Sequence, residues 1–152
     1  GLATIFIGGN TDAEKRERKD RVDDALLAVA SALAEGVVVG GGTFLLKAED
    51  ALEGLKSDNK DIMLGIDIMR QCLDAPTRKM MSNAGLSNAD ELISEVKNRD
   101  YNYGYNLETN EIVDLVEDGI IDPAKVIRVS LEAAVSAAKI FSNSFGIITN
   151  KV

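Results

Sequence analysis

The chain has 152 residues, of which 45% are hydrophobic and 5% aromatic, so we expect one modest domain, or one domain and part of another, with an aliphatic core. The formal net charge of −8 (17 − 25) argues against nucleic-acid binding, which needs a basic surface. Histidine is absent, which excludes histidine-based metal sites and triads, and no apolar run approaches the roughly 20 residues of a membrane span. The opening segment also lacks the basic start of a signal peptide.

The lone cysteine, Cys72, lies beside apolar residues in DIMRQCLDAP. We expect a buried structural thiol there. A single cysteine cannot form a disulfide within the chain, which favours a reducing, cytoplasmic setting.

The first elements are predicted to be a strand and a long helix. Residues 1–9 are mostly apolar on both alternating faces, which indicates a strand. The stretch TDAE at 11–14 matches a capping box, in which Thr11 accepts from the N–H of Glu14 and Glu14 reaches back. The helix that begins there should end near Glu35, before Gly36. Its first half is charged and its second half has an apolar face, so we expect only the second half to pack.

The middle of the chain is predicted to be mostly helical. Helices are indicated at 43–55, at 61–75, from Pro76 to about Gly85, and at 89–99. Residues 101–116, with three alternating tyrosines, predict a hairpin.

The last part of the chain is predicted to be a long apolar helix and a strand. Asp122 and Pro123 form a helix start, with Asp122 as N-cap. The helix that runs to about Ser142 is apolar nearly all round, which predicts a central place in a bundle. Residues 145–152 suggest a short strand. Strands at both chain ends, with little sheet between them, predict partner strands from elsewhere.

Three places could carry chemistry. The glycines at 40–42 match neither a phosphate loop nor a dinucleotide fingerprint, so spacing alone favours a packing hinge over close approach to a ligand. Asp24 lies at the edge of the apolar face and could order a water or act as a base, although a solvated helix face is the simpler interpretation. Asn106 follows a tight turn, and Asp122 could either cap its helix or accept from a ribose.

Two long motifs carry a family resemblance. RVDDALLAVASALAEGVVVGGGTFLL (21–46) and EVKNRDYNYGYNLETNEIVDLVEDGIIDPAKVIRVSLEAAVSAA (95–138) resemble, in order and spacing, the C-terminal part of group I chaperonins, the GroEL type. The resemblance implies a mainly α fold: a multihelical equatorial-domain bundle with short strands at the chain ends and a small hairpin. Residues 1–35 would be the returning segment of the intermediate domain. Residues 36–152 would be the C-terminal half of the equatorial, ATP-binding and ring-forming domain.

The resemblance also implies roles for single residues. Asp24 would order the water that attacks ATP. The backbone of Gly40 and Gly41 would lie against the nucleotide. Asn106 would meet the adenine edge, and Asp122 would accept from ribose hydroxyls.

One departure from the family pattern concerns the adenine pocket. Leu107 and Glu108 stand where the family usually has small residues. We therefore expect the adenine pocket to be reshaped or tighter in a divergent member.

The implied cofactors are ATP or ADP, Mg²⁺ with ligands mainly outside this chain, and K⁺. The implied partners are identical subunits in a ring, with unfolded client proteins and a co-chaperonin bound through an apical domain. No nucleic-acid or membrane partner is expected. A complete subunit would couple ATP hydrolysis to protein folding in the cytoplasm. This chain would supply half of the ATP site and be inactive alone. The alternative is a non-catalytic assembly or interaction module derived from a chaperonin.

Overall fold

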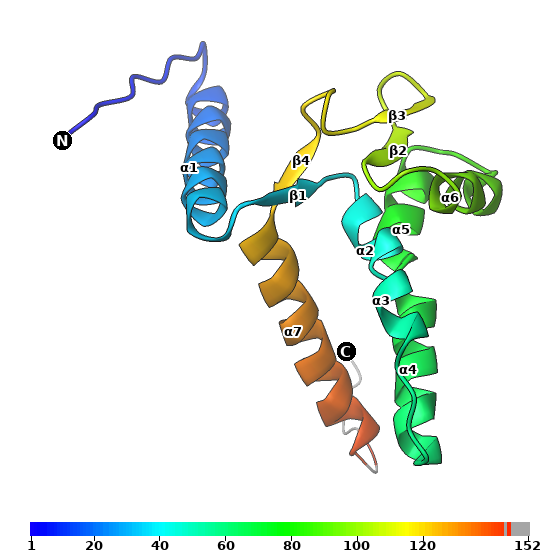
Figure 1. Cartoon of the computed structure of the whole chain (residues 1–152). Helices are drawn as coiled ribbons and strands as arrows, with labels where there is room; N and C mark the ends of the chain where they lie inside the picture. The colour runs from blue at the N-terminus through cyan, green and yellow to red at the C-terminus, as the bar shows by residue number, and fades with distance from the viewer. Residues whose placement is uncertain (145, 147–152) are drawn as a thin grey trace. The chain divides into compact units, whose positions relative to one another are not determined.

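The computed structural model describes residues 1–144 and 146 (Figure 1). The fold class predicted from the sequence, mainly helical with few short strands, is confirmed. In chain order the elements are α1 (Asp12–Glu35), β1 (Val37–Val39), α2 (Thr43–Lys47), α3 (Asp50–Glu53), α4 (Lys60–Cys72), α5 (Ala75–Asn83), α6 (Ala89–Lys97), β2 (Tyr103–Asn106), β3 (Glu111–Asp114), β4 (Ile121–Pro123) and α7 (Ala124–Ser142).

The chain divides into two compact units. The first contains residues 1–37 and the chain from Pro123 onward, and the second is Val38–Asp122. β1 and β4 pair in a two-stranded sheet. The chain leaves the first unit within β1 and returns to it within β4. The assignment of residues 1–35 and 36–152 to two chaperonin domains stays a prediction.

The start and end of α1 follow from local hydrogen bonds. The Thr11 hydroxyl accepts from the backbone N–H of Glu14 at 3.2 Å, which confirms the predicted cap. The Glu14 carboxylate reaches back to the N–H of Asn10, at 2.7 Å. At the other end Gly36 has φ 82° and donates to the carbonyl of Ala32 at 2.7 Å, a conformation that favours glycine and ends the helix.

The first unit is held by contacts between α1 and α7. Arg128 of α7 donates to both carboxylate oxygens of Glu35, at 3.0 and 2.7 Å, and to Glu132 at 2.9 Å. The N–H of Ala124 donates to the carbonyl of Gly36 at 3.0 Å. A bidentate pair of this kind fixes the two helix ends more firmly than a single ion pair would.

The Arg128–Glu35 pair predicts a pH-dependent stability of the first unit. The hydrogen bond from Arg128 holds the pKa of Glu35 below its ordinary value of 4.5. The folded state therefore binds the proton less readily than the unfolded state, and the pair stabilises above about pH 4.5 and ceases to do so as pH falls through the lowered pKa. Arg128→Met should lower the melting temperature at pH 7 and lower it less at pH 3, because the stabilisation by the pair decreases as the pH falls below about 4.5.

The matched control is Lys139→Met, which removes the same charge from another exposed side chain of α7 that has no ion pair among the described residues. Melting curves of both variants at the two pH values measure the effect. An equal loss for Arg128→Met at pH 3 and pH 7 would contradict the assignment to Glu35.

Much apolar surface of the first unit is exposed. Neither α1 nor α7 contains a buried residue, and Leu33 is 84% and Phe141 65% exposed. The expectation that α7 is central to a bundle is therefore wrong for the described part of the chain. The second half of α1 does pack on α7, with Glu35 paired to Arg128, but most of its apolar face is exposed.

The predicted strand at residues 1–9 is also wrong. The segment has no strand partner within the described residues, and Leu2 and Phe6 are more than nine-tenths exposed. A strand needs a neighbour for its backbone groups, and here the carbonyl of Gly8 accepts instead from Arg18, at 2.8 Å. The predicted strand at 145–152 falls, Gly146 apart, outside the described residues.

The second unit holds the hydrophobic core. β2 and β3 pair antiparallel with Tyr103 opposite Asp114 and Asn106 opposite Glu111, so the predicted hairpin is confirmed. Figure 1 shows the hairpin next to α6. The core cluster contains one residue of α2, one of α5 and two of α6: Leu46, Met81, Ile93 and Val96.

Two predictions for helices in this unit need correction. The helix expected at 43–55 is split into α2 and α3, because Ala51 and Leu52 donate to carbonyls three residues back and so tighten the turn. α4 forms close to its predicted bounds, but Cys72 at its end is exposed and not buried. The next residue, Leu73, is buried, whereas α4 itself contains no buried residue.

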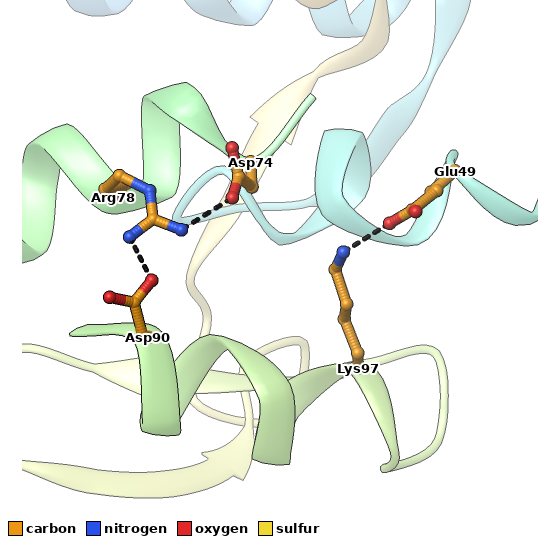
Figure 2. A network of polar contacts seen from close by, with 5 residues as sticks. All are labelled: Glu49, Asp74, Arg78, Asp90 and Lys97. Atoms are coloured by element: carbon orange, nitrogen blue, oxygen red, sulfur yellow. Dashed lines mark hydrogen bonds and ion pairs between the residues drawn. The ribbon is translucent and has the colours of Figure 1, made fainter. Parts of the chain in front are cut away.

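Ion pairs tie α5 and α6 to their neighbours (Figure 2). Arg78 of α5 bonds Asp74, at 2.8 Å, and Asp90 of α6. Lys97 at the end of α6 pairs with Glu49, which lies between α2 and α3. Among the helices that the structure describes, none is both long and apolar enough to cross a membrane.

Candidate functional site

The glycine run forms a fixed turn between β1 and α2. The N–H of Gly40 donates to the carbonyl of Ile120, and the carbonyl of Gly40 accepts from Thr43, both at 3.0 Å. A side chain at Gly40 would meet the Ile120 carbonyl oxygen at 2.9 Å. Gly41 and Gly42 have φ of 63° and 72°, values that disfavour other residues. Gly40 is buried, whereas Gly41 is only partly buried.

The connection from β3 to β4, residues 115–120, joins this turn to the hairpin. Leu115 is fully buried, and its side chain lies against the Cα positions of Gly41 and Gly104. The N–H of Ile120 donates to the carbonyl of Leu115 at 2.7 Å, which closes the connection on itself. The glycine turn and the hairpin strand that ends at Asn106 therefore pack on the same short segment.

The side chain of Asn106 is held inside the hairpin turn. It is only 8% exposed. Its amide oxygen accepts from the backbone N–H of Glu108 at 2.9 Å and of Thr109 at 3.4 Å. Its amide nitrogen donates to a carboxylate oxygen of Asp118 at 3.0 Å. The residue expected to meet a base edge thus already has three hydrogen bonds.

Leu107 and Glu108 form the exposed turn after β2. The N–H of Asn110 donates to the carbonyl of Asn106 at 2.8 Å, and Asn110 has φ 61°, which closes a four-residue loop. Leu107 is 38% exposed and Glu108 is exposed. The effect of these two side chains on an adenine pocket stays a prediction.

Asp122 lies in β4 and is not the N-cap that the sequence suggested. Pro123, with φ −65° and ψ 125°, takes the cap position of α7, because the strand pairing of residues 121–123 keeps Asp122 extended. Its carboxylate is partly buried and has no hydrogen bond or ion pair within residues 1–144 and 146. Burial raises the pKa of this carboxyl above its ordinary value of 3.8.

Because the pKa of Asp122 is raised in the folded state, the ionised side chain lowers the free energy of unfolding. The folded state holds the proton more tightly than the unfolded state, so stability falls as pH rises from about 3.8 through the raised pKa. Asp122→Asn should therefore be more stable than the wild type at pH 7 and equal to it near pH 3. Urea unfolding at the two pH values measures this. Asp58→Asn is the control, because Asp58 is exposed and has no hydrogen bond or ion pair among the described residues. A destabilised Asp122→Asn at pH 7 would contradict the assignment.

Asp24 belongs to the first unit, on α1. It is exposed, and its neighbour Asp23 pairs with Lys19 at 3.6 Å. Thus the structure groups Gly40, Gly41, Asn106 and Asp122 in one unit, and Asp24 in the other. Within the described residues, no group of three or more acidic or cysteine side chains lies close enough together to hold a metal ion.

Two residues of this region escaped sequence analysis. Asp118 sits in a charged turn that looks like ordinary solvated surface, and nothing local indicates its bond to Asn106. Lys47 is 7% exposed, and its ammonium donates to the carbonyls of Val96, Lys97 and Arg99. Burial lowers the pKa of Lys47, and Asp50 and Asp100 partly offset this. Only the apolar neighbours of Lys47 in TFLLKA hint that it is buried.

Comparison with known proteins gives the chain a family. The model of the TCP-1/cpn60 chaperonin family matches residues 1–147. The crystal structure of a group III chaperonin in the open state is similar, with a TM-score of 0.79 and 28% sequence identity. That match covers 93% of this chain and 30% of the other, so the chain spans about a third of that subunit's length. Family model and structural match agree over nearly the whole sequence, and the chain belongs to the TCP-1/cpn60 chaperonin family.

Proposed function

We propose that this chain supplies one side of the ATP site of a chaperonin subunit that assists protein folding. The observation that carries the proposal is the grouping in the second unit. The glycine turn and the end of β2 pack on the same connection, which leads into β4 and the carboxylate of Asp122. A partly buried carboxylate without a partner among the described residues suits the hydroxyl groups of a ribose.

Asp24 is proposed to order the attacking water. Phosphoryl transfer to water depends mainly on positioning, and an exposed carboxylate on α1 is free of hydrogen bonds within the described residues. The phosphate loop and the Mg²⁺ and K⁺ ligands would come from the part of a subunit beyond this chain. The surfaces that bind client proteins and a co-chaperonin would also lie in that part of the subunit. Identical subunits would form a ring in the cytoplasm.

A group I type of chaperonin is proposed from the sequence motifs. The stretches RVDDAL and GIIDPAKVIR resemble the group I pattern, whereas the similar solved structure is of group III. The subclass is tested by whether a separate co-chaperonin is needed for release of a bound client. Release without one would contradict the group I assignment.

The test of the ATP site uses the chain assembled with the remaining part of a chaperonin subunit. Asp24→Ala should lower kcat for ATP hydrolysis by about 10²-fold or more and leave the Kd for ATP unchanged, because the residue acts on the water. Asp23→Ala is the matched control, since Asp23 is the adjacent exposed carboxylate. It should leave kcat unchanged.

A second function is favoured by the exposed apolar faces of α1, α4 and α7. A non-catalytic assembly module would use these faces and need no nucleotide. The two functions differ in ATP binding, which isothermal titration calorimetry of the assembled protein measures. Assembly without any ATP binding would support the module and contradict the ATP site.

A further inference from the structure

The ammonium group of Lys47 is surrounded by backbone carbonyls at the end of α6. Lys47 is only 7% exposed. Its Nζ donates to the carbonyl oxygens of Val96, Lys97 and Arg99, at 2.5, 3.2 and 2.7 Å. No carboxylate of the described residues forms an ion pair with it. A buried cation is therefore bound here by neutral oxygen atoms alone.

The three acceptors require the charged form of Lys47. An ammonium group has three N–H donors and no acceptor, so each hydrogen can satisfy one carbonyl. A neutral amine has a lone pair in place of one hydrogen, and this lone pair would face a carbonyl oxygen. Burial lowers the pKa of Lys47, whereas the carboxylates of Asp50 and Asp100 raise it. The carbonyls and these two negative charges thus favour a cation at this point.

The carbonyls belong to a segment that is distant in sequence from Lys47. Val96 and Lys97 are the last residues of α6, where the negative end of the helix dipole lies. Arg99 lies in the connection that leads to β2. Lys47 is the last residue of α2, which begins directly after the glycine turn. One cation therefore joins α2 to the connection between α6 and the hairpin.

The oxygen atoms of this site are of the kind that binds K⁺. K⁺ channels hold their ion with backbone carbonyl oxygens, which replace its hydration shell, and K⁺ is close to an ammonium group in size and charge. Mg²⁺ fits poorly, because it needs oxygen atoms at about 2.0–2.1 Å, closer than these carbonyls lie to Nζ.

We propose that the carbonyls of residues 96, 97 and 99 form a binding site for a monovalent cation of the size of K⁺, and that the chain fills this site with its own Lys47. The stability of this part of the fold is then independent of K⁺ in solution. The proposal does not rest on the ATP site proposed above, nor on the K⁺ expected there.

Lys47→Ala empties the site, so that an added cation can enter it. The deleted atoms, from Cγ to Nζ, are those of n-propylammonium. We expect the variant to have a lower urea midpoint than the wild type and to regain part of it as n-propylammonium is added, in proportion to binding. Its midpoint should also be higher in KCl than in NaCl at equal ionic strength. The wild type, whose site is filled, should show no such difference.

Two controls separate binding at this site from general effects. 1-Propanol has the same chain but no charge, and it should not raise the midpoint of Lys47→Ala. Lys97→Ala removes an exposed ammonium from the same region, and it should respond to either cation no more than the wild type does. A folded Lys47→Ala that gains nothing from either cation would overturn the site. If the variant is unfolded in buffer, n-propylammonium should restore its helical circular dichroism, and failure to do so would also overturn the site.

The wild type allows a measurement without substitution. Nuclear magnetic resonance of the 152-residue chain at neutral pH should show the Nζ protons of Lys47 in slow exchange with water, because all three are hydrogen-bonded within the protein. The Nζ protons of the exposed Lys97 should exchange too fast to be seen. Equally fast exchange at Lys47 would overturn the proposal, because its ammonium would then not occupy the carbonyls.

Discussion

Gly104→Ala is expected to destabilise the second unit by about 2–3 kcal/mol. Gly104 lies in β2 where a methyl group would overlap the Thr43 hydroxyl and the end of the Leu115 side chain. Both neighbours are at most 1% exposed, so neither can move into solvent. Close-packed interiors tolerate added volume poorly, and the strain should appear as a lower urea midpoint.

The control for this change is Gly65→Ala. Gly65 is inside α4, and a methyl group there would meet nothing within 4 Å. Alanine is the better helix former, so this variant should be more stable by up to about 1 kcal/mol. The same substitution is thus expected to lower stability at one site of the unit and to raise it at the other. A neutral Gly104→Ala would show that Thr43 and Leu115 can rearrange at little cost.

Lys47→Met is expected to destabilise the second unit by about 3 kcal/mol. The methionine keeps the apolar stem but removes the ammonium from the carbonyls of Val96 and Arg99, at 2.5 and 2.7 Å, and of Lys97, at 3.2 Å. The Val96 carbonyl also accepts from the backbone N–H of Arg99, at 3.1 Å, whereas the carbonyls of Lys97 and Arg99 have no other donor among the described residues. Burial makes each unsatisfied carbonyl costly.

Lys97→Met is the matched control, because it removes a lysine from the same region. Lys97 is exposed, and Glu49 is its one ion-pair partner among the described residues (Figure 2). Solvent screens such a pair, and the loss should be below about 1 kcal/mol. Urea midpoints of both variants decide the comparison. Equal losses would mean that the three carbonyls find water or other donors when Lys47 is removed.

The predictable parts of the fold are those whose signal is local. The Thr11 cap, Gly36 after α1, Pro76 in the first turn of α5 and the hairpin each depend on a few neighbouring residues. The failures depend on long-range contacts. Residues 1–9 need a partner strand, and Asp122 is held in β4 by pairing with β1, more than 80 residues earlier. Nothing in the neighbouring sequence specifies either partner.

The candidate site shows the same division. The resemblance predicted Gly40, Gly41, Asn106 and Asp122, and the structure gathers these four in one unit. It could not predict that Asp118 holds Asn106, because that bond joins side chains 12 residues apart across the hairpin. Lys47 was missed for the same reason, since its acceptors lie about 50 residues further along the chain.

The exposed apolar faces of α1, α4 and α7 also have a calorimetric consequence. The heat capacity of unfolding rises with the apolar area that folding removes from water. For 152 residues it would ordinarily be about 2 kcal/mol/K. The described helices leave much of their apolar area in water, so the chain alone should show a smaller increment. The part of the heat capacity change that is missing from folding would appear as a negative heat capacity change when these faces are covered on assembly. The enthalpy of assembly should therefore depend steeply on temperature.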